Sequence, residues 1–191
     1  MMTRTEWQLS EADGELQIHT GVAGRAAKMG HRLALTMAAW RATVAVTDGE
    51  PSGADLTVDV GSLAVSRSEG GVKALSHHEL KIIRRNALKS LGVKRFPEIG
   101  FHADGIEKLG NGDYRVAGTL EIHGKRHGRA VDFRIDDLGD CWRLSGQAEV
   151  RQTDFGIKPF SLFGGTLKVE DKVTITVDVT RPKDQSPTDI G

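Results

Sequence analysis

Apolar and polar residues alternate along much of the second half of the chain, between Asp113 and Thr180. Side chains of a β-strand point to opposite faces at successive residues, so this period of two predicts strands with one dry and one wet face. The apolar positions form four sets: Tyr114, Val116, Leu120 and Ile122; Val131, Phe133 and Ile135; Trp142, Leu144, Ala148 and Val150; and Val173, Ile175, Val177 and Val179. Long antiparallel strands of this kind most simply close into a barrel, because closure removes exposed edges. We therefore expect the function to lie inside.

The first half of the chain carries weaker alternation that predicts further strands. Leu16 and Ile18 indicate one strand, and a long strand is expected after Gly30. The apolar positions of this long strand are Leu33, Leu35 and Met37, followed by Trp40, Ala42, Val44 and Val46. Their parity changes near Ala38 and Ala39, and one extra residue there, in a β-bulge or a bend, would keep both halves facing inward.

Turn residues predict how the next strands are connected. Asp48 and Gly49, together with the segment 51–53, indicate a hairpin turn. The strand that follows this turn carries Leu56, Val58 and Val60. A later strand carries Ile99, Phe101 and Ala103, and the segment 110–112 turns the chain into the alternating second half.

The segment 76–91 is predicted to form the one main helix. Ser76 and Glu79 give the Ser-x-x-Glu pattern of a capping box, and Gly92 is a natural terminator. Helical spacing groups four apolar residues, Leu80, Ile83, Ala87 and Leu91, and leaves three basic residues, Lys81, Arg85 and Lys89, on the other side. We expect the helix to lie across the barrel with its apolar face buried against the sheet and its basic residues in water.

The length of 191 residues suits one domain with a sizeable core. We expect a single barrel domain over residues 1–182. The polar tail 183–191 has few residues to bury and is expected to be disordered.

The charge balance disfavours a general nucleic-acid or anionic-membrane surface, because 26 basic and 26 acidic residues give a formal net charge of +0. The first seven residues lack the apolar run of a signal peptide, and no segment is apolar enough to be a membrane span. These features predict a cytoplasmic protein without a transmembrane segment. The lone Cys141 excludes an internal disulfide and supplies no thiolate cluster for zinc.

Four motifs resemble one known family, the YceI-like lipid- or polyisoprenoid-binding proteins. The motifs are DLTVDVGSL at 55–63, the helix followed by RFPEIGF at 95–101, VAGTLEIHG at 116–124 and QTDFGI at 152–157, with VEDKVTI at 169–175 closing the match. The resemblance runs from about residue 21 to residue 179. It implies an all-β fold with one main α-helix, an extended antiparallel lipocalin-like β-barrel with the helix packed across it. It also implies a long apolar molecule in the lumen and makes a homodimer an expectation.

The sequence contains no motif that indicates enzymatic chemistry or metal binding. His77 and His78 are adjacent, so they lie on different faces of the helix and lack the spacing of a helical metal pair. His123 and His127 flank a tight turn, where a role as turn residues is favoured over adventitious metal binding. Neither a nucleophile elbow nor a phosphate-binding loop is present. We expect no catalytic residue, no metal and no cofactor.

The segment 157–167 places three large apolar residues, Phe160, Leu162 and Phe163, in a connection punctuated by proline and glycine. Ordinary loops are polar, so these side chains need another role. Two interpretations remain open. The residues either cap the bottom of the barrel or form a rim through which a lipid enters.

The leading hypothesis is a non-enzymatic carrier that sequesters a hydrophobic small molecule, such as an isoprenoid, a quinone or a fatty-chain lipid, in the lumen. The expected ligand-binding residues are Trp40, Leu56, Val58, Phe101, Tyr114, Val116, Leu120, Phe133, Trp142, Phe155, Phe160 and Phe163. The hydroxyl of Tyr114 is a candidate partner for a polar head group. The alternative is a packed barrel that acts as a structural or protein-interaction module linked to stress and holds no ligand.

Overall fold

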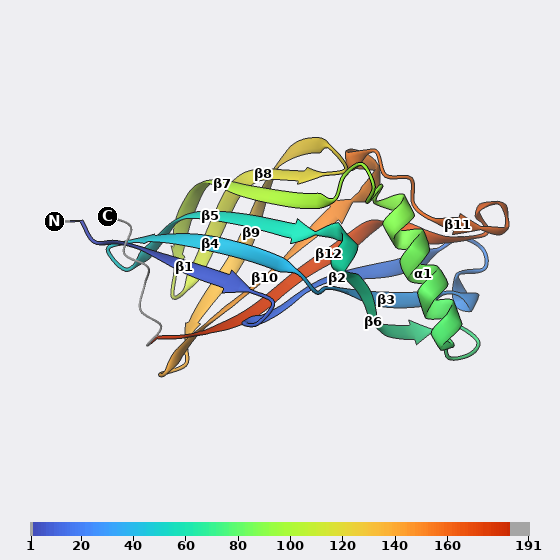
Figure 1. Ribbon diagram of the computed structural model, residues 1–191, viewed down its shortest axis with the longest axis horizontal. Coiled ribbons are helices and arrows are strands. Elements are labelled where there is room, and N and C mark those ends of the chain that lie inside the picture. The colour runs from blue at the N-terminus through green and yellow to red at the C-terminus, as the bar shows by residue number, and fades with distance from the viewer. Residues whose placement is uncertain (1, 184–191) are drawn as a thin grey trace.

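A computed structural model describes residues 2–183 as one twelve-stranded antiparallel sheet with a single α-helix (Figure 1). The first six strands are β1 (Arg4–Ser10), β2 (Gly14–Ala23), β3 (His31–Met37), β4 (Trp40–Thr47), β5 (Glu50–Asp59) and β6 (Leu63–Gly70). The helix α1 (His77–Ser90) separates them from β7 (Glu98–Gly110), β8 (Asp113–Ile122), β9 (Lys125–Asp137), β10 (Cys141–Arg151), β11 (Ser161–Leu162) and β12 (Leu167–Pro182). The all-β prediction with one helix is confirmed. Of the tail expected to be disordered, only Lys183 lies within the described residues.

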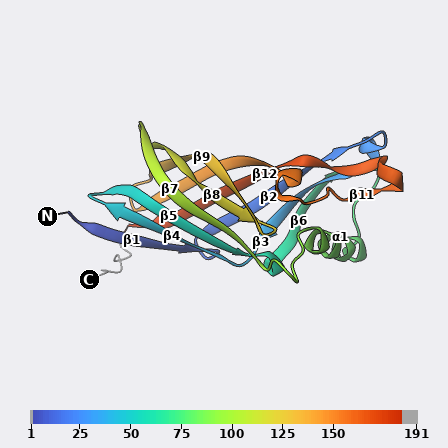
Figure 2. The same cartoon turned by 90° about the horizontal axis from the view of Figure 1, so that it is seen from above.

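The sheet curls strongly into an elongated half-barrel (Figure 2). Its strand order is β1-β4-β5-β7-β8-β9-β10-β12-β2-β3-β6, with β11 paired only to β12. Among the described residues no ladder joins β1 to β6, so the sheet has two edges where a full barrel would have a seam. The right-handed twist of the strands supplies the curl.

The long strand predicted after Gly30 is in fact two strands with different neighbours. The chain bends at Ala38 and Ala39, so β3 pairs with β2 and β6 whereas β4 pairs with β1 and β5. Met37 and Trp40 are both buried on either side of this bend. The bend therefore keeps both halves facing inward, as the change of parity indicated.

The edge strands β1 and β6 were not expected from the sequence. β1 contributes Leu9 to the core and pairs with β4 from Arg4↔Thr47 to Ser10↔Arg41. β6 has a single fully buried apolar residue, Leu63, at its start. Edge strands pair on one side only and carry charged residues that discourage further pairing, so they show little hydrophobic pattern.

The ends of α1 follow the predicted capping. The Ser76 hydroxyl accepts a hydrogen bond from the Glu79 N–H at 3.3 Å, and the Glu79 carboxylate accepts one from the Ser76 N–H at 2.8 Å. Arg84 ties the helix to the edge of the sheet by donating to the carbonyl oxygens of Leu63 and Gly61, both at 2.7 Å. The helix thus covers part of the edge that β6 would otherwise expose.

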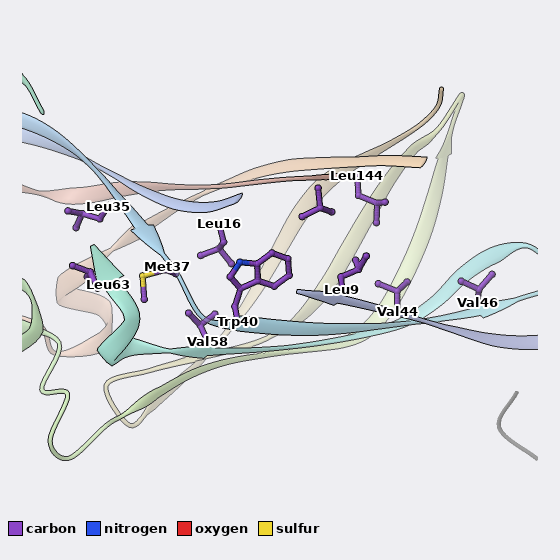
Figure 3. Close-up of a cluster of buried hydrophobic side chains, with 11 residues drawn as sticks. Leu9, Leu16, Leu35, Met37, Trp40, Val44, Val46, Val58, Leu63 and Leu144 are labelled. Carbon is purple, nitrogen blue, oxygen red and sulfur yellow. The ribbon is translucent and has the colours of Figure 1, made fainter. Parts of the chain in front are cut away.

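One half of the interior is filled by side chains, as Figure 3 shows. Trp40 lies at the centre of this core. The buried members are Leu9, Leu16, Leu35, Met37, Trp40, Val44, Val46, Val58, Leu63, Leu144 and Val179. Trp7 and Trp142 stack beside this cluster with ring centroids 6.4 Å apart. The core therefore closes the half of the barrel that contains β1 and β4.

Candidate functional site

The other half of the interior contains a cavity of about 1150 Å³. Its apolar wall is built by α1, β8 and β12, which contribute Ile82, Ile83, Ala87, Leu120, Ile122, Val173, Ile175 and Val177. Pockets for drug-sized ligands usually measure about 300–1,000 Å³ and are mostly apolar. The cavity is thus large enough for an extended ligand.

The cavity explains why the apolar face of α1 is only half-buried. The sequence predicted that Leu80, Ile83, Ala87 and Leu91 would be buried against the sheet, but none of them is fully buried. Ile83, Ala87 and Leu91 face the cavity instead of tightly packed side chains. Lys81, Arg85 and Lys89 are exposed, as predicted.

The floor of the cavity is the surface of the packed core. The residues that belong to both are Leu16, Leu35, Met37, Val58 and Leu63. Trp40 lies beneath this layer, and its indole nitrogen Nε1 is buried without a hydrogen-bond partner among the described residues. Figure 3 shows this nitrogen on the side of the ring that faces Leu16. The indole N–H of Trp40 is therefore a buried hydrogen-bond donor beneath the apolar floor of the cavity.

Seven of the twelve residues expected to bind ligand line the cavity. They are Leu56, Val58, Phe101, Leu120, Phe133, Phe155 and Phe160. The structure thus brings together side chains from β5, β7, β8, β9 and two later segments. Their role in binding stays a prediction.

The other five expected residues, Trp40, Tyr114, Val116, Trp142 and Phe163, lie away from the cavity wall. The Tyr114 hydroxyl donates a hydrogen bond to Glu50 at 2.6 Å. Burial, together with this bond, raises the pKa of Tyr114 to about 12. Its hydroxyl therefore already has a protein partner in place of a ligand head group.

The sequence reasoning missed the contribution of α1 and of the first hairpin to the wall. Ile82 and Ile83 line the cavity, as do Leu16 and Leu33. The helical periodicity had marked Ile83 as an inward position, but it could not show that the space opposite is empty.

The wall between β9 and β10 is incomplete beside the cavity. These strands pair from Trp142↔Asp137 to Gln147↔Asp132, and the pairing ends there. Residues of both sheet faces line the cavity at this point, including Asp132 and Gln147 from the outer face. A gap in a ladder lets outer and inner side chains reach the same space.

Phe155 packs beside this gap and is fully buried. It follows β10 in a short 3₁₀ turn (Gln152–Phe155) and clusters with Val150. The His127 ring meets the Phe155 ring edge-on at 4.9 Å, and the Arg129 guanidinium lies 5.5 Å from the ring centroid. Arg129 also binds Asp154 at 2.8 Å. The turn therefore connects the two strands where their ladder stops.

Three loops meet at the end of the half-barrel farthest from β1 (Figure 1). The loop 24–30 donates a hydrogen bond from the Ala26 N–H to the Thr166 carbonyl at 2.9 Å. His31 contacts the Lys73 carbonyl at 2.8 Å, which brings the segment 70–75 to the same end. Met29, Leu75 and Leu162 line the cavity from these loops, so this end forms its mouth.

The sequence predicted that the segment 157–167 either caps the bottom of the barrel or forms a rim through which a lipid enters. In the structure the segment has features of both. Phe160 is half-buried and lines the cavity, whereas Phe163 is 75% exposed and does not line it. The first phenylalanine borders the lumen, and the second stands at the outer surface of the mouth.

The titratable groups are arranged mainly as ion pairs on the outer face of the sheet. Arg115 lowers the pKa of Asp132 through a hydrogen bond of 2.8 Å, and Arg143 likewise lowers the pKa of Asp178. Between residues 2 and 183, no group of three or more His, Cys, Asp or Glu side chains is arranged to hold a metal ion. Over the same range, no helix is long and apolar enough to cross a bilayer.

An antiparallel half-barrel with a helix across it and a large apolar cavity defines a class of small lipocalin-like domains. The sequence model of the YceI-like domain matches residues 7–181, and the chain therefore belongs to the YceI-like family. A comparison with the curated proteins finds no match.

Solved structures share this fold at low sequence identity. The crystal structure of BcnA from Burkholderia cenocepacia is similar with a TM-score of 0.70 and 18% identity, over 89% of this chain and 97% of that chain. The Campylobacter jejuni YceI protein has a TM-score of 0.55 and 17% identity, over 71% of this chain and 75% of that chain. A mutant of the Campylobacter protein was solved with a monobromobimane guest, at the same TM-score of 0.55. Identities this low establish the fold alone.

Proposed function

We propose that this protein is a non-enzymatic carrier that sequesters a long apolar molecule, an isoprenoid, a quinone or a fatty-chain lipid, in its cavity. The observation that carries the proposal is the apolar cavity of about 1150 Å³ between α1 and the sheet. The resemblance to the YceI-like lipid- and polyisoprenoid-binding proteins supports the same class of ligand. The cavity disfavours the alternative of a barrel packed throughout.

The binding energy would come from moving methylene groups out of water. Each one transferred to an apolar site is worth about 0.8 kcal/mol. About ten methylenes would therefore outweigh the cost of association and of ordering a flexible chain. The ligand needs little polar recognition, because most of the cavity wall is apolar and charged residues at its border, such as Arg115 and Asp132, already pair with each other. The predicted homodimer and the predicted cytoplasmic location stay predictions.

Uptake of a fluorescent fatty-chain probe tests the proposal directly. Ala148→Trp projects a large side chain into the cavity from β10 and should weaken probe uptake by about tenfold or more, because it removes ligand volume. Ala117→Trp is the matched control, since Ala117 is exposed on β8 outside the cavity. Native mass spectrometry of the purified protein should also show a co-purifying lipid.

Two results would contradict the carrier proposal. One is the absence of both probe uptake and co-purifying lipid in the wild-type protein. The other is equal uptake by Ala148→Trp and the wild type, which would place the probe outside the cavity.

A further inference from the structure

The mouth of the cavity carries an apolar tip formed by Met29, Val72, Leu162 and Phe163. Their exposed fractions are 55%, 76%, 44% and 75%. They come from three loops held together by the contacts Ala26–Thr166 and His31–Lys73. Met29 and Leu162 also line the cavity, whereas the other strongly exposed apolar residues of the described chain, Met2, Leu109 and Leu138, do not. Large apolar residues exposed on neighbouring loops at one end of a molecule are typical of an interaction surface.

The same three loops, together with the strand and helix residues next to them, carry a concentrated positive charge. The segments 24–32, 70–78 and 156–168 contain six of the 26 basic residues of the chain and none of its 26 acidic residues. The six residues are Arg25, Lys28, Arg32, Lys73, Lys158 and Lys168. The formal net charge of +0 had disfavoured an anionic surface as a partner. This value hides a basic end, because the rest of the chain contains more acidic than basic residues.

Most of this charge is free to meet a partner. Glu79 pairs with Lys73 at 3.2 Å, Glu69 lies opposite Arg32 and Glu170 borders the loops. Within residues 2–183, Arg25, Lys28, Arg32, Lys158 and Lys168 form no salt bridge. The outer face of the sheet differs, because arginines such as Arg115 and Arg143 are paired with aspartates there.

We propose that this end docks on an anionic lipid bilayer, with Phe163 and its apolar neighbours inserted among the lipids and the basic residues held at the head groups. Apolar side chains at the interface and Lys or Arg beside them are the two components of peripheral membrane binding. A nucleic acid would use the charge but would leave most of the apolar tip in water. Docking in this orientation turns the cavity mouth toward the bilayer, where an apolar ligand resides.

Co-sedimentation with vesicles tests the proposal. One set of vesicles contains phosphatidylcholine alone and the other contains equal amounts of phosphatidylcholine and phosphatidylglycerol. The wild-type protein should bind the anionic set and be released by high salt, because screening weakens the attraction. Arg25→Glu with Lys28→Glu should weaken binding by about tenfold or more, since each basic residue near an anionic surface contributes substantially. Phe163→Ser should weaken it by several-fold through lost insertion.

Matched controls carry the same changes away from the mouth. Arg4→Glu with Arg41→Glu repeats the charge reversal on β1 and β4, and Leu138→Ser removes an apolar side chain that is 56% exposed between β9 and β10. Both controls should bind anionic vesicles as the wild type does. Vesicle binding does not require a filled cavity, so it can fail while probe uptake succeeds.

Three outcomes would overturn the docking proposal. They are no binding of the wild type to anionic vesicles, equal binding to both vesicle sets, and controls that lose as much binding as the mouth variants. A dimer in light scattering that Phe163→Ser converts to a monomer would also overturn it, because the tip would then be covered by a second copy of the chain.

Discussion

Tyr114, Val116 and Leu120 lie on one face of the same strand, yet they have different surroundings. Tyr114 and Val116 are buried at 8% and 7% exposure and lie outside the cavity. Leu120, further along β8, lines the cavity wall. The boundary between packed interior and open lumen therefore crosses β8 between Val116 and Leu120.

This boundary predicts different tolerance to a large side chain. Val116→Trp should destabilise the protein by about 1–3 kcal/mol, because added volume in a packed site forces neighbouring side chains out of position. Ala148→Trp, which enters the cavity, should change the free energy of unfolding much less. Denaturant unfolding monitored by far-UV circular dichroism measures both. Equal losses of stability would mean that the space beside Ala148 is not available to a side chain.

At the scale of the element, α1 is stabilised at its start by a charged cap. Backbone and side-chain hydrogen bonds from Ser76, with help from Lys73, lower the pKa of Glu79 from 4.5 to about 2. A carboxyl with a lower pKa in the folded state stabilises the fold above its ordinary pKa. This contribution is lost as the pH falls from 4.5 toward about 2.

Glu79→Gln should therefore lower the melting temperature at about pH 7, and the difference from the wild type should shrink as the pH falls through this range. Thermal unfolding at a series of pH values gives the measurement. Glu98→Gln, at an exposed position on β7, serves as the control. A difference that stays constant down to pH 2 would show that the charge of Glu79 has no part in the cap.

The strand elements explain which parts of the sheet could be predicted from the sequence. The strands β8, β9, β10 and β12 are long and pair on both sides, so each shows clear alternation. The edge strands β1 and β6 bury fewer side chains and were missed. The end of the β9–β10 ladder at Gln147↔Asp132 was also unpredicted, because pairing depends on the neighbouring strand as well as on local pattern.

At the scale of the whole molecule, the half-barrel has a closed end filled by the core and an open end surrounded by loops (Figure 2). This arrangement assigns separate roles to the two phenylalanines of the segment 157–167. Phe160 borders the lumen, whereas Phe163 lies at the outer tip.

Phe160→Ser should accelerate release of a bound fatty-chain probe by several-fold, since it removes an apolar contact at the mouth. Phe163→Ser should leave release in the absence of vesicles near the wild-type rate. Stopped-flow measurement of probe release separates the two variants. Unchanged release from Phe160→Ser together with a large fall in melting temperature would identify Phe160 as a plug of the barrel, with the entrance elsewhere.

The sequence by itself determined the strands of the second half, the face that each turns inward, the capped helix and the family resemblance. These features depend on residues close together in the chain. A period of two tells which side of a strand is dry, and the Ser76–Glu79 box requires only one turn of helix.

Only the tertiary structure decided whether an inward residue meets another side chain or an empty lumen. That outcome depends on how far apart opposite walls lie, which is set by strand pairing, by the curl of the sheet and by the position of α1. The same holds for the basic, apolar mouth, because its successive loops are separated by about forty to ninety residues in the sequence. Local pattern carries no information on distances between segments so far apart, and these distances create both the cavity and the surface at its mouth.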